Sequence, residues 1–123
     1  MIRGLHHIAI IGFSNECISF YERLGFVIDA RRLRPDCGDE IIWMKGFDVY
    51  LELFLFKKHP KRIVDPEAYG LSHLAFFVDN LDKMLEIMSQ YKCDPIKIGH
   101  SGMRTCFIYD PAGTPIELKE IIR

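Results

Sequence analysis

The chain has 123 residues, 49% of them hydrophobic, and a formal net charge of −1 at pH 7. This length suits one compact domain, and a near-zero charge argues against nucleic acid or a lipid surface as partner. No apolar stretch approaches the roughly 20 residues of a membrane span, and the strand-like start leaves no room for a signal peptide. Four scattered cysteines without a C-x-x-C pair predict free thiols in a reducing cytoplasm.

The first half of the sequence predicts one helix among four strands. Strand-like runs cover 5–11, 26–33, 40–45 and 48–56, and Gly38 and Gly46 mark turns. A helix is expected after the first run. It is indicated by a cap at Ser14-Asn15, by the helically spaced apolar residues Ile18, Tyr21 and Leu24, and by a stop at Gly25.

The second half repeats this order after a polar segment with two prolines, KKHPKRIVDPEAYG (57–70). Strands are expected at 72–78, near 95–98, at 103–109 and at 114–119. A helix over 80–91 is indicated by a cap at Asp79 or Asn80 and by an apolar face of Leu81, Met84, Leu85 and Met88. The sequence DPAG (110–113) predicts a turn with proline at its second position.

Matching motifs indicate an internal duplication. His7-Ile8-Ala9 matches His73-Leu74-Ala75 at an offset of 66, and Leu51-Glu52-Leu53 matches Ile116-Glu117-Leu118 at an offset of 65. The repeated unit, of about 60 residues, reads βαβββ. We therefore predict a single domain made of module 1 (about 1–57), a linker (58–70) and module 2 (71–123).

The duplication places His7 and His73, and likewise Glu52 and Glu117, at equivalent points of apolar strands. Taken singly, each histidine could be a hydrogen-bonded core residue, and each glutamate could face solvent. A carboxylate in apolar surroundings needs compensation, either from a nearby Arg or Lys or from a divalent cation. The repetition favours the cation, and a mixed set of imidazoles and carboxylates suits Zn, Ni, Co, Fe or Mn.

The chain resembles the vicinal oxygen chelate superfamily and, within it, the bacterial glyoxalase I-like (lactoylglutathione lyase) proteins. The motifs that carry the resemblance span essentially the whole chain: LHHIAII, FYERLGF, YLELFLF, GLSHLAFFVDNLD and FIYDPAGTPIELKE. The resemblance implies an α+β fold in which two paired βαβββ modules form an open cupped sheet. This is the glyoxalase/bleomycin resistance/dihydroxybiphenyl dioxygenase fold.

The resemblance also implies one divalent metal ion per site, with Zn, Ni or Co favoured and Fe or Mn as alternatives. The ligand pattern carries over as His7, Glu52, His73 and Glu117, with His6 turned to the opposite face. Family dioxygenases and fosfomycin-modifying transferases use three ligands, so a fourth at Glu52 is typical of glyoxalase I. The implied reaction is a metal-dependent lyase or isomerase reaction on an α-hydroxy or α-keto thiol adduct. Glu117 and Glu52 would transfer a proton through a metal-bound enediolate.

The resemblance does not identify the thiol part of the substrate. Glutathione-dependent relatives carry an arginine and an asparagine where this chain has Ile11 and Phe56, so the thiol stays open. An epimerase of methylmalonyl-CoA type and a non-catalytic, antibiotic-binding protein are the alternative functions. A cytoplasmic homodimer with sites at its interface is expected. Candidate substrate contacts are Arg104, Phe54, Phe56 and Trp43; Arg31, Arg32 and Arg34 are further candidate cations that could equally be surface charges.

Overall fold

A computed structural model of the chain describes residues 1–122. It divides into two compact units, the first running from Met1 to Pro60 and the second starting at Lys61. The division lies inside the segment expected to link the modules. Among the described residues, no helix is long and apolar enough to cross a membrane.

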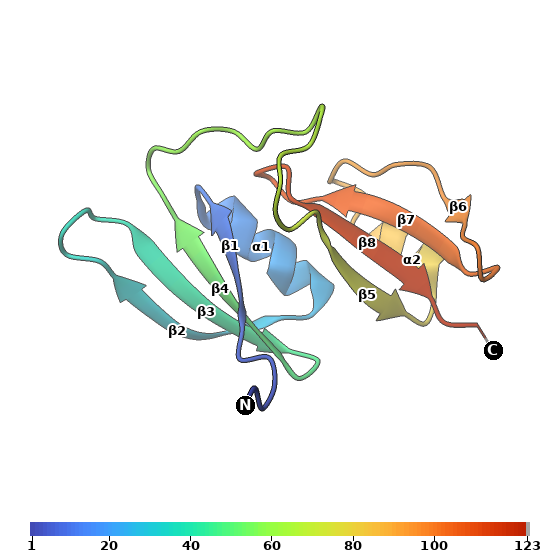
Figure 1. Ribbon diagram of the computed structural model, residues 1–123, viewed down its shortest axis with the longest axis horizontal. Coiled ribbons are helices and arrows are strands. Elements are labelled where there is room, and N and C mark those ends of the chain that lie inside the picture. The colour runs from blue at the N-terminus through green and yellow to red at the C-terminus, as the bar shows by residue number, and fades with distance from the viewer. Residues whose placement is uncertain (123) are drawn as a thin grey trace. The chain divides into compact units, whose positions relative to one another are not determined.

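Unit 1 contains one helix and one four-stranded sheet (Figure 1). In chain order its elements are β1 (Ile8–Gly12), α1 (Asn15–Leu24), β2 (Val27–Leu33), β3 (Glu40–Gly46) and β4 (Val49–Leu55). The strand order is β1-β4-β3-β2, with β1 parallel to β4 and the other neighbours antiparallel. The first and last strands of the unit therefore lie side by side.

Unit 2 repeats this topology. Its elements are β5 (Leu74–Val78), α2 (Leu81–Ile87), β6 (Lys97–Ile98), β7 (Arg104–Tyr109) and β8 (Pro115–Glu120). The order β5-β8-β7-β6 again joins the first and last strands in parallel. Register repeats as well, because Ala9 pairs with Glu52 and Ala75 pairs with Glu117. The predicted α+β fold with a duplicated βαβββ unit is confirmed.

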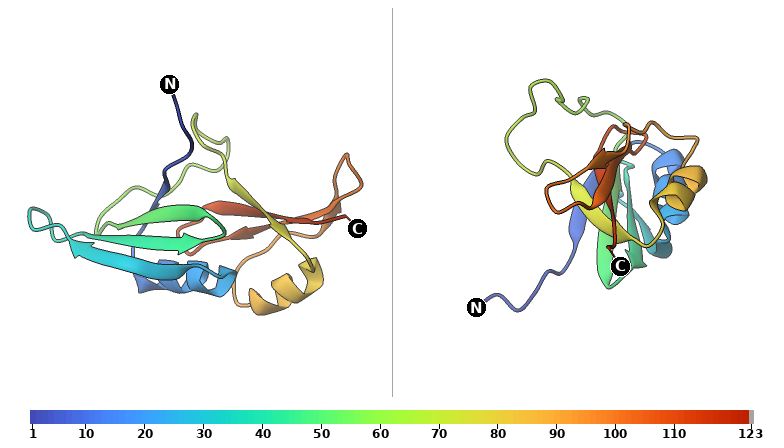
Figure 2. Two further views of the ribbon diagram at one scale, coloured as in Figure 1. Left: turned by 90° about the horizontal axis from the view of Figure 1, so that it is seen from below. Right: turned by 90° about the vertical axis from the view of Figure 1, so that its right-hand side faces the viewer.

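Each sheet has a helix-covered face and an open face, and α1 and α2 each cover one face of their own sheet (Figure 2). In β4, Leu51, Leu53 and Leu55 are buried, whereas Tyr50, Glu52 and Phe54 alternate with them on the open face. In β8, Ile116 and Leu118 are buried and Glu117 lies between them on the other face. The core of each unit therefore lies between its helix and its sheet.

Local sequence signals explain where α1 begins and ends. The Ser14 side chain accepts a hydrogen bond from the backbone N–H of Glu16, and Gly25 takes a left-handed conformation with φ of 116°. Gly12, at the end of β1, allows the helix to approach the strand. A Cβ at Gly12 would lie 2.8 Å from Cys17 Sγ, so a larger residue there would push the two elements apart.

Several element boundaries and one turn differ from the sequence prediction. The strand expected from residue 5 begins at Ile8, and the strand expected from residue 72 begins at Leu74. The helix expected to reach residue 91 ends at Ile87, after which Tyr91 N–H bonds to the Met88 carbonyl three residues back, in a tighter turn. The β3–β4 turn is made by Phe47 and Asp48, with φ of 55° and 62°, rather than by Gly46. Positive φ at both central residues gives the twist that a two-residue hairpin requires.

The predicted DPAG turn is confirmed and joins β7 to β8. The buried Asp110 carboxylate accepts hydrogen bonds from the backbone N–H groups of Ala112 (2.9 Å) and Thr114 (2.8 Å). Gly113 has φ of 87°, a conformation that favours glycine. The turn thus fixes the start of β8, two residues before Glu117.

We expect Leu53→Ala to destabilise the protein by about 2–5 kcal/mol, because it removes a fully buried side chain from the unit 1 core. Leu33→Ala is the matched control, since Leu33 is 62% exposed, and its effect should stay within about 0.5 kcal/mol. Urea denaturation followed by circular dichroism measures both changes. Equal effects of the two substitutions would contradict the assignment of the core.

Candidate metal centre

Unit 1 brings a histidine and a glutamate together on the open face of its sheet. His7 lies directly before β1, and Glu52 lies in the middle of the parallel neighbour β4. His7 Nε2 is 3.4 Å from Glu52 Oε1, and the Glu52 side chain is only 14% exposed. The sheet topology therefore produces the pairing that the sequence predicted within this module.

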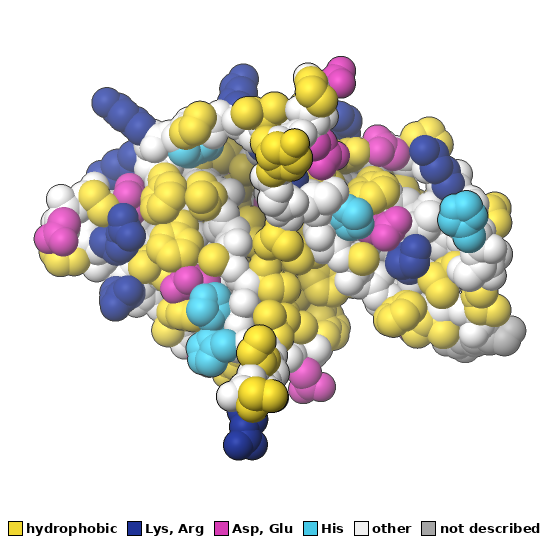
Figure 3. Space-filling view, in the orientation of Figure 1, with side chains coloured by type: hydrophobic (Ala, Val, Ile, Leu, Met, Phe, Trp, Pro, Cys, Tyr) yellow, Lys and Arg dark blue, Asp and Glu magenta, His cyan; other side chains and the backbone are white. Residues whose placement is uncertain are grey.

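Unit 2 contains the same pair at the equivalent position. His73 lies directly before β5, Glu117 lies in β8, and His73 Nε2 is 3.7 Å from Glu117 Oε1. The Glu117 side chain is 16% exposed, so neither glutamate simply faces solvent. The space-filling view shows histidine beside acidic side chains over each sheet, surrounded by hydrophobic surface (Figure 3).

Each imidazole has a polar partner at its other ring nitrogen. His73 Nδ1 lies 2.9 Å from Ser72 Oγ. His7 Nδ1 lies 2.7 Å from His6 Nδ1, so one of these nitrogens donates to the other. An imidazole whose Nδ1–H donates a hydrogen bond has its Nε2 lone pair free for a cation. When Nδ1–H of either histidine donates to this neighbour, Nε2, which faces the glutamate, is free to bind a cation.

His6 lies elsewhere than the sequence prediction placed it. Strict alternation would turn His6 to the face opposite His7, but His6 is exposed and contacts His7, with ring centroids 5.0 Å apart. The reason is that β1 begins only at Ile8. Alternation along a strand applies to residues within it, and both histidines precede it.

An aromatic residue packs edge-on against each histidine. Trp43 contacts His7 and Phe107 contacts His73, with ring centroids 4.9 Å apart in both cases. Both aromatics are the cross-strand neighbours of the glutamates, since Trp43 pairs with Glu52 and Phe107 with Glu117. Trp43 is half-buried on the open face, next to the candidate ligands, rather than in the core. The aromatic rings restrict the imidazole orientations.

The spacing of each pair fits a shared cation. Two nitrogen or oxygen donors bound at about 2.0–2.2 Å to one metal ion lie about 3.0–3.4 Å apart. The observed separations of 3.4 and 3.7 Å need only small side-chain movements to meet this value. Within residues 1–122 no group of three or more His, Cys, Asp or Glu side chains is arranged to hold a metal ion. Each unit therefore supplies two donors, half of the predicted set.

The alternative compensation, by a basic side chain, is present in one unit. Lys119 Nζ lies 3.7 Å from Glu117 Oε1, whereas the ion-pair partner of Glu52 within residues 1–122 is His7. The two carboxylates are nevertheless covered to the same degree. A half-buried glutamate in this register therefore does not require a neighbouring lysine.

The predicted apolar lining lies further along the open face of unit 1. Phe54 and Phe56 are half-buried, with ring centroids 5.6 Å apart, and Ile11 pairs with Phe54 across β1 and β4. The Arg34 guanidinium lies over both rings, at 5.9 Å from Phe54 and 5.6 Å from Phe56. This arrangement resembles a cation–π contact. Ile11 and Phe56 are thus part of an apolar surface that lies next to the Arg34 guanidinium.

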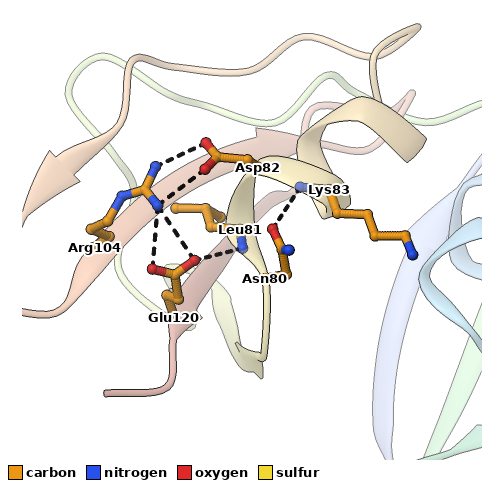
Figure 4. Close-up of polar contacts among 6 residues, drawn as sticks. All are labelled: Asn80, Leu81, Asp82, Lys83, Arg104 and Glu120. Carbon is orange, nitrogen blue, oxygen red and sulfur yellow. Dashed lines mark hydrogen bonds and ion pairs between the residues drawn. The ribbon is translucent and has the colours of Figure 1, made fainter. Parts of the chain in front are cut away.

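Arg104, predicted to contact substrate, lies on the other face of its sheet. It shares a face of β7 with the buried Cys106 and Ile108, opposite to Phe107. Its guanidinium forms ion pairs with Asp82 of α2 (2.9 Å) and Glu120 of β8 (3.3 Å), as Figure 4 shows. The hydrogen bond from Arg104 lowers the pKa of the Asp82 carboxyl. Arg104 is therefore already paired and faces away from Glu117, on the side of the sheet opposite to the candidate ligands.

Tyr109 is a further titratable group on the Phe107 side of β7. Its hydroxyl donates to Asp94 Oδ2 over 2.6 Å, and this bond to a carboxylate raises the pKa of Tyr109 to about 12. The phenol is therefore protonated at neutral pH and is no candidate for a base.

Sequence reasoning missed two neighbours of the pairs. Phe107 could have been found from the repeat, because it stands 64 positions after Trp43, close to the offset of the glutamates. Ser72 could not have been found in this way, because its equivalent position holds His6. The contact that these two different residues share is visible only in the folded structure.

Comparison with known proteins identifies the family of this duplicated fold. The chain belongs to the Glyoxalase/Bleomycin resistance protein/Dioxygenase superfamily, whose family model matches residues 4–118. It is 36% identical to the Escherichia coli (strain K12) protein YaeR over 97% of both chains. It is 33% identical to the Bacillus subtilis (strain 168) protein YwkD over 98% of both.

Solved structures share the fold. A glyoxalase family protein from Enterococcus faecalis is 30% identical with a TM-score of 0.86, over 96% of this chain and 98% of that one. A trypanothione-dependent glyoxalase I from Leishmania major is 26% identical with a TM-score of 0.72, over 97% and 87%. The resemblance to the superfamily is thus confirmed, while the narrower resemblance to bacterial glyoxalase I stays a prediction.

We expect Ser72→Ala to weaken the binding of Co²⁺ or Zn²⁺ roughly tenfold, since the partner of His73 Nδ1 is lost. Competition titration against a chromophoric chelator measures the affinity. Ser89→Ala is the control, because Ser89 is exposed and lies beyond the end of α2. Unchanged affinity in Ser72→Ala would exclude a role for Ser72 in orienting the imidazole.

Proposed function

We propose that this protein is a divalent-metal-dependent enzyme of glyoxalase I type, with His7, Glu52, His73 and Glu117 as the metal ligands. One observation carries the proposal: each unit holds a His–Glu pair in the same register, with donors at a spacing that suits a shared cation. Superfamily members typically use a divalent metal ion. Four donors of this type suit Zn, Ni or Co, with Fe or Mn as alternatives.

The proposed reaction moves a proton between adjacent carbons of an α-hydroxycarbonyl compound. The cation would supply Lewis acidity, which stabilises negative charge on substrate oxygens as the neighbouring C–H is deprotonated. Glu117 and Glu52 are the candidate bases, because each carboxylate lies on an open sheet face. One carboxylate accepts the proton from the first carbon, and a carboxylic acid returns it to the second.

The relatives and the apolar lining support a substrate class for the proposed reaction. Glyoxalase I enzymes such as the Leishmania major relative point to the adduct of a thiol with a 2-oxoaldehyde. Phe54, Phe56 and Trp43 would contact its apolar parts, and Ile11 and Phe56 offer no polar anchor for glutathione. We therefore propose a thioester-forming isomerisation of a hemithioacetal whose thiol differs from glutathione. Assays with 2-acyl thioesters would reveal the epimerase alternative.

The proposed assembly is a cytoplasmic homodimer with sites at its interface. Proteins of this fold commonly act as dimers on small molecules. Two half-sites per chain, each with two donors, allow one subunit to supply His7 and Glu52 and the other to supply His73 and Glu117. Such a dimer would have two equivalent sites.

Glu117→Gln should lower turnover of a methylglyoxal hemithioacetal by about a hundredfold or more, because it removes a ligand and a candidate base together. Substrate deuterated at the carbon next to the carbonyl should react more slowly or lose deuterium to water. Formation of the thioester is followed by its ultraviolet absorbance.

Glu86→Gln is the matched control for this substitution, because Glu86 is an exposed residue of α2. It should leave the rate unchanged. Full activity of Glu117→Gln on every substrate of the wild-type enzyme would exclude proton transfer by Glu117. Wild-type protein that takes up no divalent metal would overturn the proposed function itself.

Mixing His7→Ala chains with Glu117→Ala chains tests whether sites are shared between subunits. In a shared-site heterodimer both lesions fall in one site, and the other site is intact. Activity should therefore return when heterodimers form, to about half the wild-type value per dimer. Differently tagged chains allow heterodimers to be purified. An inactive heterodimer would show that each site belongs to a single chain.

A further inference from the structure

The open faces of the two sheets differ in the row of side chains next to the glutamates. In unit 2 this row is Phe77, Lys119 and Thr105, which are neighbours across β5, β8 and β7. In unit 1 the corresponding row, across β1, β4 and β3, is Ile11, Phe54 and Ile41. The row is entirely apolar in unit 1 but contains an ammonium and a hydroxyl in unit 2.

The position of Lys119 is not explained by a need to neutralise Glu117. Lys119 Nζ lies 3.7 Å from Glu117 Oε1, but Glu52 is covered to the same degree with Phe54 in the place of the lysine. With a divalent cation bound, the charges of Glu52 and Glu117 would balance the cation and leave the ammonium of Lys119 without a compensating anion.

We infer that Lys119 binds a carboxylate of the substrate, next to the reacting carbons held at Glu117. This inference rests on the proposed function of that site. The lysine side chain is 34% exposed on the open face, so its ammonium can exchange Glu117 for an incoming anion. The proposed substrate is therefore an α-hydroxycarbonyl compound or thioester that carries its own negative charge.

Thr105 supplies a second polar group at the same place. Its Oγ1 is closed to solvent and finds no hydrogen-bond partner among the residues that the structure describes. Buried polar groups are normally hydrogen-bonded, so an unmet group beside Lys119 calls for an explanation. Lys119 and Thr105 are directly opposite each other in register. An ammonium and a hydroxyl together match the two oxygens of a carboxylate, and neighbouring side chains must move to bring the carboxylate to the closed hydroxyl.

The register and the length of the lysine side chain together limit the distance between the charge and the chemistry. Lys119 follows Glu117 by two residues on the same face, so their Cα atoms lie about 7 Å apart along the strand. The ammonium itself lies 3.7 Å from Glu117 Oε1, so a carboxylate within a few bonds of the reacting carbon is within its reach. Arg104 does not compete for it, since it is paired with Asp82 and Glu120 on the other face.

Calorimetry of the metal-loaded protein with glutaric acid monohydroxamate and its methyl ester tests the inference. A hydroxamate presents two adjacent oxygens, and the two probes differ only at the distal group, which is a carboxylate in one and its neutral methyl ester in the other. Wild-type protein should bind the acid about tenfold more tightly than the ester, since a charge-assisted hydrogen bond contributes this much. Lys119→Met should lose the preference while binding the ester as the wild type does.

Lys83→Met is the matched control, because Lys83 is an exposed lysine of α2 whose side chain points away from the sheet (Figure 4). It should keep the tenfold preference. Equal affinity of wild-type protein for acid and ester would overturn the inference and leave the proposed function standing. A preference for the acid that persists in Lys119→Met would likewise overturn the inference and leave the proposed function standing. Failure of the metal-loaded protein to bind either hydroxamate would overturn the proposed function and the inference with it.

Discussion

Alternation of side chains along β4 and β8 is the constraint on which the other features of this protein depend. In both strands, large aliphatic residues at every second position pack toward the helix, and the glutamate between them is thereby turned to the open face. A shift of one residue in register would bury the carboxylate in the core and expose the leucines, at a large cost in free energy. The packing that stabilises each unit therefore also fixes the orientation of its candidate base.

Parallel pairing of the first and last strands then brings a histidine to each glutamate. His7 and Glu52 are 45 positions apart in the sequence, yet their side-chain donors are 3.4 Å apart, because β1 lies beside β4. On the parallel neighbouring strand, the residue opposite each glutamate is an alanine, Ala9 in one unit and Ala75 in the other. A small side chain at this point leaves space above the carboxylate for the imidazole. The strand order therefore brings together a histidine and a glutamate that lie far apart in the sequence.

The repeat made the fold predictable from the sequence and singled out the four candidate ligands, which remain a prediction. Periodicity showed the strands, and two copies of one pattern distinguished His7 and Glu52 from isolated polar residues of a core. Prediction failed where tertiary contacts override local pattern. His6 lies beside His7 because the strand starts later than its apolar run indicates. Arg104 pairs with Asp82, a residue of a helix 22 positions away whose approach no sequence pattern reports.

The two units have similar side chains next to the glutamates and different side chains in the next cross-strand row. Around the carboxylate both have an alanine, a histidine and an edge-on aromatic, Trp43 or Phe107. In the next row, Phe54 of one unit stands where the other has Lys119. The first set of residues limits the chemistry, since it holds the donors and orients them. The next row touches only what the reacting group is attached to. A duplicated fold can therefore keep one type of reaction while the row that contains Phe54 or Lys119 changes with the substrate. For this reason the sequence indicates the class of reaction more readily than the molecule on which the protein acts.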